Sequence, residues 1–284
     1  MADANVNALP QQRRFAETLR PDAWWLQPLV VFLGFSAFIV YSTWAAFHPL
    51  YHGACAYWFN GNGADYLSPF FSPQIFHPAN CSPELARHAW LGGQPGWWPS
   101  WIIFSPAFFV LWAPAGFRFT CYYYRGAYYK AFWADPTNCA VGEPRKSYLG
   151  ERYFPLIIQN VHRYFMYIAV IFIGILAYDA WKAMWFTENG AEHFGIGVGT
   201  IVLLLNAIFL GSYTFGCHSL RHLIGGFLDQ PSKKPLCAKG YSCVSCLNRR
   251  HMMWAWISLF WVGFTDVYVR LCAMGTIHDF SWHF

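Results

Sequence analysis

Five long apolar runs dominate this sequence and restrict it to folds that a lipid bilayer permits. Each is close to the roughly 20 residues that an α-helix needs to cross the hydrocarbon core of a membrane. They are predicted at about Trp24 to Phe47, Trp98 to Tyr123, Pro155 to Trp181, Ile196 to Leu223 and Met252 to Ala273. Hydrophobic residues make up 56% of the 284 residues and charged residues only 12%, about half the charged share of a soluble domain. We therefore predict an all-α integral membrane protein, a bundle of five transmembrane helices.

The positions of the cations predict the orientation of this bundle. Arg and Lys gather before the first run, after the second and after the fourth, whereas the alternate loops carry only Arg87 and Lys182. The gathered cations are Arg13, Arg14, Arg20, Arg118, Arg125, Lys130, Arg145, Lys146, Arg152, Arg221, Lys233, Lys234, Lys239, Arg249 and Arg250. Because cytoplasmic loops carry an excess of Lys and Arg, the N-terminus is predicted inside and the C-terminus outside. The net charge of +5 is thus spread over loops beside the membrane, which argues against a nucleic-acid partner.

The chain is predicted to consist of a cytoplasmic segment, residues 1–22, and a single membrane domain, residues 23–284. The first segment shows no signal-peptide pattern, so the first apolar run is expected to remain as a helix. The outer loop 48–96 is rich in Pro, Gly, Asn and aromatic residues and is expected to form a cap over the helix ends. Its Cys55 and Cys81 either form a disulfide, which an oxidising compartment permits, or stay as two unpaired small residues.

Two inner loops, 124–153 and 224–250, carry most of the remaining polar residues. The first combines aromatic residues and cations with two turn signals, Asp-Pro and Glu-Pro. It is interpreted as a docking surface for another protein, or alternatively as an aromatic belt at the lipid interface. The second is expected to be a flexible loop with Cys237, Cys243 and Cys246, a set that makes a weak case for zinc.

Seven thiol and imidazole side chains fall at the same end of the predicted helices. They are Cys121, Cys139, His162, Cys217, His218, His222 and His251. His162 lies about two turns into the third run, and His218 and His222 are neighbours on one helix face because they are four positions apart. Such groups are costly at the edge of a bilayer without partners, so their convergence suggests a metal or redox centre.

Three interpretations of this cluster remain open. A b-type haem would take two axial imidazoles, His162 with His218 or His222. A Rieske-type [2Fe-2S] cluster would take two thiolates and two imidazoles, for which we select Cys121, Cys139, His162 and His222, with His218 next. The third possibility is a polar helix bundle in which the histidines only form hydrogen bonds and the cysteines pack as small apolar groups.

Further polar residues at the same level suggest a quinone site. Arg163 and Arg221 stand beside histidines and either position a quinone head group or extend to lipid phosphates. We predict Arg163, His218, Arg221 and His251 as quinone-binding residues, with His218 or His251 as a proton donor. Asp179, Asn206 and Asp266 lie toward the other half of the bundle, where they relay protons or form hydrogen bonds at helix ends. No phosphate-binding glycine loop or nucleophile elbow is present in the sequence, so no catalytic residue is assigned.

Five segments together resemble one known family. TCYYYRGAYYKAFW, NCAVGEP, RYFPLIIQNVHRYFMY, CHSLRHLIGG and RRHMMWAWISLFWVGFTDVY are similar to the membrane-anchor subunit of succinate dehydrogenase and fumarate reductase, in its actinobacterial, single-chain, five-helix form. The resemblance covers roughly residues 20–280, and the loop Cys237 to Cys246 departs from the family pattern.

The resemblance implies a multi-pass protein of the bacterial plasma membrane that docks an iron-sulfur subunit and a flavoprotein subunit. It implies that electrons from succinate reach menaquinone, with a Rieske-like [2Fe-2S] cluster in the anchor. A haem b-bearing anchor of the same complex and a cofactor-free structural anchor are the alternatives.

Overall fold

The computed structural model describes residues 14–145, 152–154, 156–188, 190–226 and 229–283. The chain divides into two compact units, which are described separately. Unit 1 comprises Met1–Ala37 and Phe119–Asn160, and unit 2 comprises Phe38–Arg118 and Val161–Phe284. In the described ranges, four helices are long and apolar enough to cross a membrane: Leu26–Phe47, Leu156–Lys182, Val198–Phe215 and His251–Ala273. These correspond to four of the five predicted spans.

The second predicted span, Trp98 to Tyr123, is broken into short helices. They are α2 (Ala107–Val110), α3 (Trp112–Phe119) and α4 (Tyr122–Gly126). Pro106 precedes the first helical residue, and Pro114 has no N–H with which to continue the hydrogen-bond ladder. Residues 107–119 would extend about 20 Å as a helix, less than the roughly 30 Å of a hydrocarbon core. Five unbroken spanning helices are therefore not observed in the described residues.

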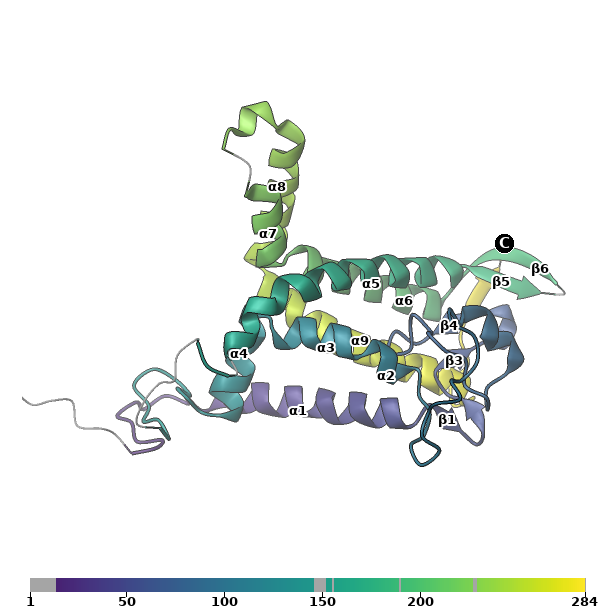
Figure 1. The fold of residues 1–284 in the computed structure, drawn as a ribbon, viewed down its shortest axis with the longest axis horizontal. Coiled ribbons are helices and arrows are strands. Elements are labelled where there is room, and N and C mark those ends of the chain that lie inside the picture. Colours follow the sequence, from purple (N-terminus) through teal and green to yellow (C-terminus); the bar gives the residue numbers. More distant parts are fainter. Residues whose placement is uncertain (1–13, 146–151, 155, 189, 227–228, 284) are drawn as a thin grey trace, which may run out of the picture. The chain divides into compact units, whose positions relative to one another are not determined.

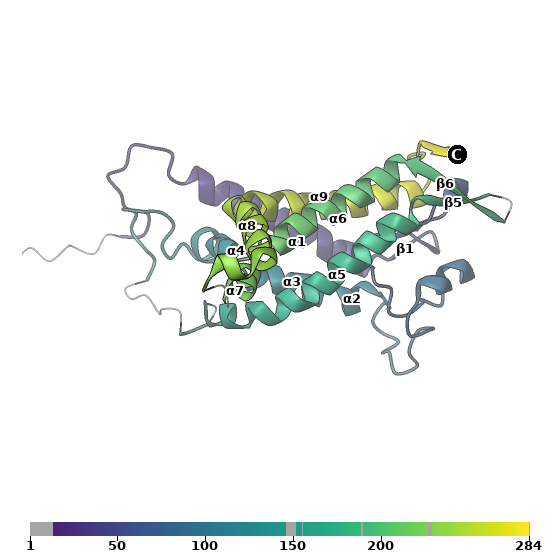
Figure 2. The ribbon, with the colours of Figure 1, turned by 90° about the horizontal axis from the view of Figure 1, so that it is seen from above.

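Three helices form the bundle of unit 2. They are α5 (His162–Lys182), α6 (Val198–Phe215) and α9 (His251–Ala273), and α6 packs against both of the others (Figures 1 and 2). Small residues on the buried face of α6, including Gly199, Ala207 and Gly211, allow such close packing between helices.

The ends of this bundle differ in chemistry. At one end His162 of α5 contacts Cys217, which follows α6, and at the other the Thr200 hydroxyl donates to the Ala183 carbonyl at 2.8 Å. The helices α5 and α6 are therefore antiparallel. We call the end with His162 the histidine end and the opposite end the cap end.

A helical hairpin replaces the flexible loop predicted over residues 224–250. It consists of α7 (His218–Gly225), a short 3₁₀ turn (Pro231–Lys233) and α8 (Pro235–Arg249). The two helices lie side by side at the histidine end, opposite the strands (Figure 1). Pro235 occupies the first turn of α8, where a missing N–H costs nothing. The loop prediction was wrong because it rested on the absence of a long apolar run, whereas a short amphipathic helix needs only one apolar face.

The fourth predicted span ends eight residues early, at Phe215 rather than Leu223. A Cβ atom at Gly216 would lie 2.8 Å from the Ser212 carbonyl oxygen and 3.1 Å from His251 Nδ1. Only glycine fits this close approach, and the chain changes direction there before α7 begins.

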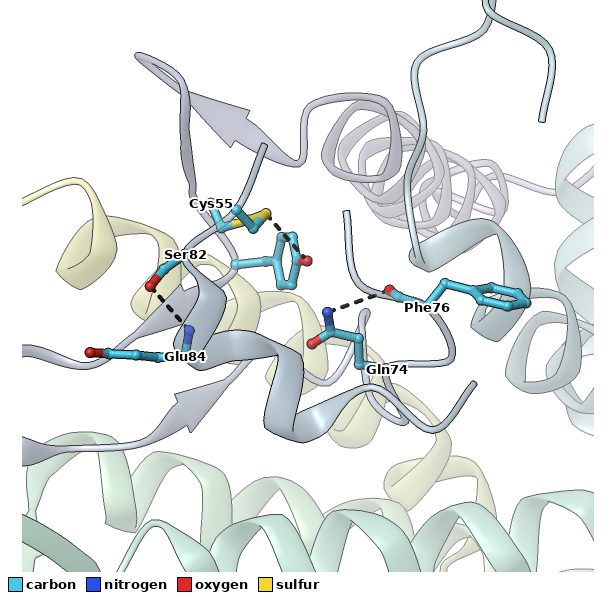
Figure 3. The surroundings of a disulfide bond; sticks show 7 residues. Cys55, Gln74, Phe76, Ser82 and Glu84 are labelled. Carbon is cyan, nitrogen blue, oxygen red and sulfur yellow. Dashed lines mark hydrogen bonds between the residues drawn. A yellow bond between two sulfur atoms is a disulfide. The ribbon is translucent and has the colours of Figure 1, made fainter. Parts of the chain in front are cut away.

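Residues 48–96, the predicted outer loop, form a cap on the bundle of unit 2. It contains two short antiparallel hairpins, β1 (Leu50–Tyr51) with β2 (Ala54–Cys55) and β3 (Trp58–Phe59) with β4 (Tyr66–Leu67), and the 3₁₀ segments Gly61–Gly63 and Pro83–His88. Of the two alternatives for Cys55 and Cys81, the disulfide is present, with Cα atoms 5.3 Å apart (Figure 3). Behind it the rings of Tyr57 and Phe71 stack with centroids 4.0 Å apart, and both are fully buried.

A buried polar network fastens the cap to the bundle. Asp266 on α9 accepts hydrogen bonds from Ser68, from the Tyr41 hydroxyl at 2.6 Å and from Arg270 at 2.7 Å. Ser72 of the cap likewise donates to Asp179 on α5. Of the two roles predicted for Asp179 and Asp266, proton relay and hydrogen bonding at helix ends, these contacts support hydrogen bonding.

A three-stranded sheet that the sequence analysis did not predict lies at the cap end. Its antiparallel strands are β5 (Trp185–Glu188), β6 (Ala191–Gly197) and β7 (Ser281–His283), in the order β5-β6-β7. The Tyr66 hydroxyl donates to Asp279 at 2.8 Å, which connects β4 of the cap to the segment just before β7.

Unit 1 joins the start of the chain to the first predicted inner loop. The helix α1 (Leu26–Phe47) begins in this unit, and a π-helical turn (Ala127–Phe132) follows α4. Residues 16–20 pair with residues 138–142: Gly142 N–H donates to the Glu17 carbonyl at 2.9 Å, and the Arg20 guanidinium donates to Asn138 and to the Cys139 carbonyl. Arg13 and Lys146, two of the predicted topology cations, lie outside the described residues.

Candidate functional site

The histidine end of unit 2 places an imidazole against a thiol. Nε2 of His162, in the first turn of α5, lies 3.1 Å from Sγ of Cys217. Cys217 is the residue before α7 begins, and its exposed fraction is 1%, while that of His162 is 9%. Two soft or borderline donors are thus held together away from water, in the environment expected of ligands or redox groups.

Aromatic rings stack around this pair. The ring of Phe117 stacks on that of His162 with centroids 4.8 Å apart, and Phe117 also touches Tyr213. Tyr213 in turn stacks on His251 at 4.9 Å, and His251 is 2% exposed. His251 therefore belongs to the same packed layer as His162, as the sequence analysis expected from its position at the start of a helix.

Arg118 is a buried residue of this layer that the sequence analysis assigned to an inner loop. Its guanidinium donates to the Ala255 carbonyl at 3.1 Å and to the Ser258 hydroxyl at 3.0 Å, and it lies over the Tyr213 ring at 4.8 Å. A buried cation within a membrane bundle is costly and usually functional. Its signal in the sequence was an Arg inside the predicted span Trp98 to Tyr123.

Four other predicted residues of unit 2 lie close to this layer in sequence: Arg163, His218 and His222 are exposed, and Arg221 is half-buried. Nε2 atoms of His218 and His222 are 2.9 Å apart on an exposed face of α7. Partial burial, together with the nearby His222 and Arg221, lowers the pKa of His218 and favours its neutral form. Arg221 donates to Ser245 at 3.0 Å and to the Tyr241 hydroxyl at 2.9 Å, so it joins α7 to α8. Arg163 is exposed on α5.

The two remaining predicted ligands, Cys121 and Cys139, belong to unit 1. Cys121 is buried directly before α4, whereas Cys139 is exposed beside Asn138. Cys237, Cys243 and Cys246 are all exposed along α8. Among the residues that the structure describes, no three His, Cys, Asp or Glu side chains are grouped closely enough to hold a metal ion. The predicted ligand set therefore stays a prediction.

A small apolar cavity adjoins the same layer. It has a volume of about 140 Å³, comparable to a cavity that holds one benzene molecule. Phe117, Arg118 and Tyr213 line its histidine side, and Phe38 and Phe70 line it toward the cap. The cavity gives an apolar space beside Phe117, whose ring stacks on that of His162.

Comparison with known proteins identifies the family. The sequence model of the family described as actinobacterial succinate dehydrogenase subunit SdhC matches residues 26–275 of this chain. A chain in the structure titled Mycobacterium smegmatis Sdh1 complex in the apo form is 43% identical, with a TM-score of 0.80, over 95% of this chain and 96% of that chain. A search of curated proteins gives no match. This multi-pass membrane protein therefore belongs to the actinobacterial succinate dehydrogenase subunit SdhC family.

Proposed function

We propose that this chain is the membrane anchor through which a succinate dehydrogenase complex of the bacterial plasma membrane passes electrons from succinate to menaquinone. The chain supplies no succinate chemistry of its own. The observation that carries the proposal is the buried contact between His162 and Cys217, set among stacked rings and beside the buried Arg118. The family membership and the similarity to a chain of the Sdh1 complex support the assignment to such a complex.

Unit 1 supplies the surface on which we propose that the iron-sulfur subunit docks, with the flavoprotein subunit bound beyond it. Arg125 lies over the rings of Tyr122 and Tyr129, at 4.4 and 5.5 Å. Tyr122 and Tyr123 are exposed. Exposed tyrosines combined with arginine are typical of protein interfaces, and this composition supports the docking interpretation over a lipid belt. The predicted cytoplasmic position of this face is part of the proposal.

The donor types at the histidine end fit a Rieske-type [2Fe-2S] cluster, which takes two thiolates and two imidazoles. His162 and Cys217 would each supply one donor, and His251 lies in the same layer. On the predicted ligand list, Cys121 of unit 1 is buried, whereas Cys139, His218 and His222 are exposed. We therefore propose the buried pair His162 and Cys217 as the first donors to test, with the ligand set chosen from the sequence, Cys121, Cys139, His162, His222 and His218, as the alternative. When bound, such a cluster supplies one-electron transfer.

The haem b alternative requires the same imidazole. Nε2 of His162 faces the Cys217 sulfur at 3.1 Å, and His218 and His222 face each other. No observation in the described residues favours haem, and the experiment below separates haem, cluster and cofactor-free anchors by their spectra.

The chain's own residues can also handle the protons of quinone reduction, which takes up two electrons and two protons. One of His218 and His222 donates a hydrogen bond to the other, so the pair holds a proton at the exposed end of the bundle. Arg163, Arg221 and His251 complete the proposed quinone-binding set. Because His251 is buried and His218 exposed, we assign proton uptake from water to His218 and a positioning role to His251.

The decisive experiment measures iron, acid-labile sulfide and low-temperature EPR of the purified complex. We compare the wild type with Cys217→Ser and with the matched control Cys272→Ser, which replaces another buried cysteine near the far end of α9. The proposal expects loss of two iron and two sulfide, and of one EPR signal, in Cys217→Ser alone.

Three other outcomes would change the assignment. Loss in Cys139→Ser with retention in Cys217→Ser would restore the ligand set chosen from the sequence. A bis-histidine haem spectrum that both serine variants retain would make His162 a haem ligand. Unchanged iron and sulfide in every variant, without haem, would leave a structural anchor.

A further inference from the structure

The helix α8 carries a pair of exposed cysteines that the proposed function does not use. Cys243 and Cys246 are three positions apart in the second half of this 15-residue helix, and neither is in a disulfide. Residues three positions apart on a helix are neighbours on its surface, so the two thiols belong to one face. Cys237, six positions before Cys243, is not such a neighbour. The pair is therefore a two-donor group of its own.

Contacts on the other side of α8 hold the helix in place. Arg221 of α7 donates to Ser245 at 3.0 Å and to the Tyr241 hydroxyl at 2.9 Å. Near the end of α8, Asn248 donates to the Gly216 carbonyl at 2.8 Å. Because the helix is fastened along its length, helix geometry sets the spacing of the two thiols, with no loop to adjust it.

This spacing favours a bridging ion over a disulfide. Cβ atoms three positions apart on a helix are about 5–6 Å apart, whereas a disulfide needs about 3.5–4.5 Å. A metal–thiolate bond is about 2.3 Å long, so one ion can bridge sulfurs that are as far as about 4.6 Å apart. An ion between Cys243 and Cys246 therefore fits a regular helix, whereas a disulfide would distort it.

The number of donors restricts the choice of ion. Structural zinc takes four ligands, and no three His, Cys, Asp or Glu side chains are grouped as a metal site in the described part of the chain. Cu(I) is a soft ion that thiolates select, and two thiolates in a nearly linear arrangement satisfy it. Cys243 and Cys246 are therefore a complete set for Cu(I) without a third protein ligand.

The cations on the same face favour a complex with negative charge. Lys239 lies four positions before Cys243 and Arg249 three positions after Cys246, so each thiol has an exposed cation one turn away. The helix contains no Asp or Glu. Two thiolates and one Cu(I) carry a single net negative charge, which these cations stabilise. With a divalent ion the same complex is neutral and gains nothing from them.

We propose that Cys243 and Cys246 form a binding site for one Cu(I) ion on α8. Both thiols release their protons to water and both sulfurs coordinate the ion, with no electron transferred. Lys239 and Arg249 neutralise the anionic complex. The positive-inside pattern predicts that this end of the chain is cytoplasmic, where thiols stay reduced. The site is independent of the proposed transfer of electrons to quinone.

The test titrates the whole detergent-purified complex with Cu(I) under nitrogen, in competition with the chromogenic chelator bicinchoninate. The wild type should take one more copper per copy of this chain than Cys243→Ser or Cys246→Ser. Cys237→Ser, a matched control that removes another exposed cysteine of α8, should bind as the wild type does. Copper bound elsewhere in the complex cancels, because all these variants share those sites.

A charge variant tests the electrostatic part of the proposal. At the roughly 5–6 Å spacing of helix neighbours, Coulomb's law in water predicts about threefold weaker Cu(I) binding in Lys239→Gln. Lys239→Arg, which keeps the charge, should bind as the wild type does. Lys182→Gln, at the far end of α5, should have no effect.

Two results on the cysteines would overturn the proposal in different ways. Equal copper binding in the wild type and Cys243→Ser, or an equal loss in Cys237→Ser, would leave only independent surface thiols. A Cys243–Cys246 disulfide found by mass spectrometry in protein purified under nitrogen would make the two cysteines a redox pair. Iron and acid-labile sulfide should be the same in all these variants, which verifies assembly and separates this result from the experiment at the histidine end.

Discussion

The ion pair between Asp266 and Arg270 should be the most sensitive point in the attachment of the cap. The two side chains are 0% and 5% exposed and are 2.7 Å apart. Arg270 also donates to the carbonyls of Ala45 and His48, both at 2.7 Å, so its guanidinium ties α9 to the end of α1. Removing one partner of such a pair leaves a buried, uncompensated charge, which costs about 3–5 kcal/mol.

A double-mutant cycle measures this coupling. Asp266→Leu and Arg270→Met should each lower the midpoint of thermal unfolding of the purified complex by about 10 °C, at about 2–4 °C per kcal/mol. The double variant has no unpaired charge, so its loss should be well below the sum of the two single losses, by at least about 2 kcal/mol. Arg87→Met, a control that removes a half-exposed partner of Asp65, should cost about 1 kcal/mol or less. Additive effects of the two buried substitutions would refute the coupling.

Three more predictions concern the cap and the hairpin. Cys81→Ser opens a disulfide that spans 26 positions, so the cap should lose about 3.5 kcal/mol of stability, measured by its rate of proteolysis. Burial alone would raise the pKa of Asp65. The hydrogen bond from His88 and the positive charges of His88 and Arg87 instead hold that pKa below its usual range. Its stabilisation is therefore complete above the unfolded carboxyl's pKa of about 4 and is lost as the pH falls through the lower folded value. Denaturant unfolding of the cap should show this acid loss in the wild type and not in Asp65→Asn. Arg221→Met removes the hydrogen bonds to α8, and hydrogen exchange of α8 should rise while that of α6 stays constant.

The sequence predicted the parts of the fold that depend on hydrophobic length. The helices α1 and α9 begin and end within two residues of the predicted spans, and so does α5 together with the 3₁₀ segment Leu156–Val161 that precedes it, because an apolar run of this length has few alternatives in a membrane. The Cys55–Cys81 pairing was one of two open readings, since the approach of two Cα atoms depends on the folded cap.

The sequence-based predictions were wrong where prolines or contacts with distant residues, and not the hydrophobicity of a segment, decide its structure. Trp98 to Tyr123 is apolar enough to span, yet Pro106 and Pro114 break it. Arg118 was counted as a loop cation because its flanking sequence says nothing of Ala255 and Ser258, which lie 137 and 140 positions away. For the candidate site, the sequence predicted that His162 and His251 lie at the same end of the helices, and both lie in one packed layer. The contact between His162 and Cys217 could not be predicted, because it requires the break at Gly216.

The helices of unit 2 have unequal lengths, and a bilayer must accommodate the difference. The 18 residues of α6 extend about 27 Å, whereas the 23 residues of α9 extend about 34 Å. A hydrocarbon layer of about 30 Å is too thick for one and too thin for the other, at a cost of fractions of a kcal/mol per Å. Lipids that touch the exposed side chains of α6, such as Ile201 and Ile208, should therefore be compressed. The protein would favour a locally thinner membrane on that flank, with shorter acyl chains enriched there.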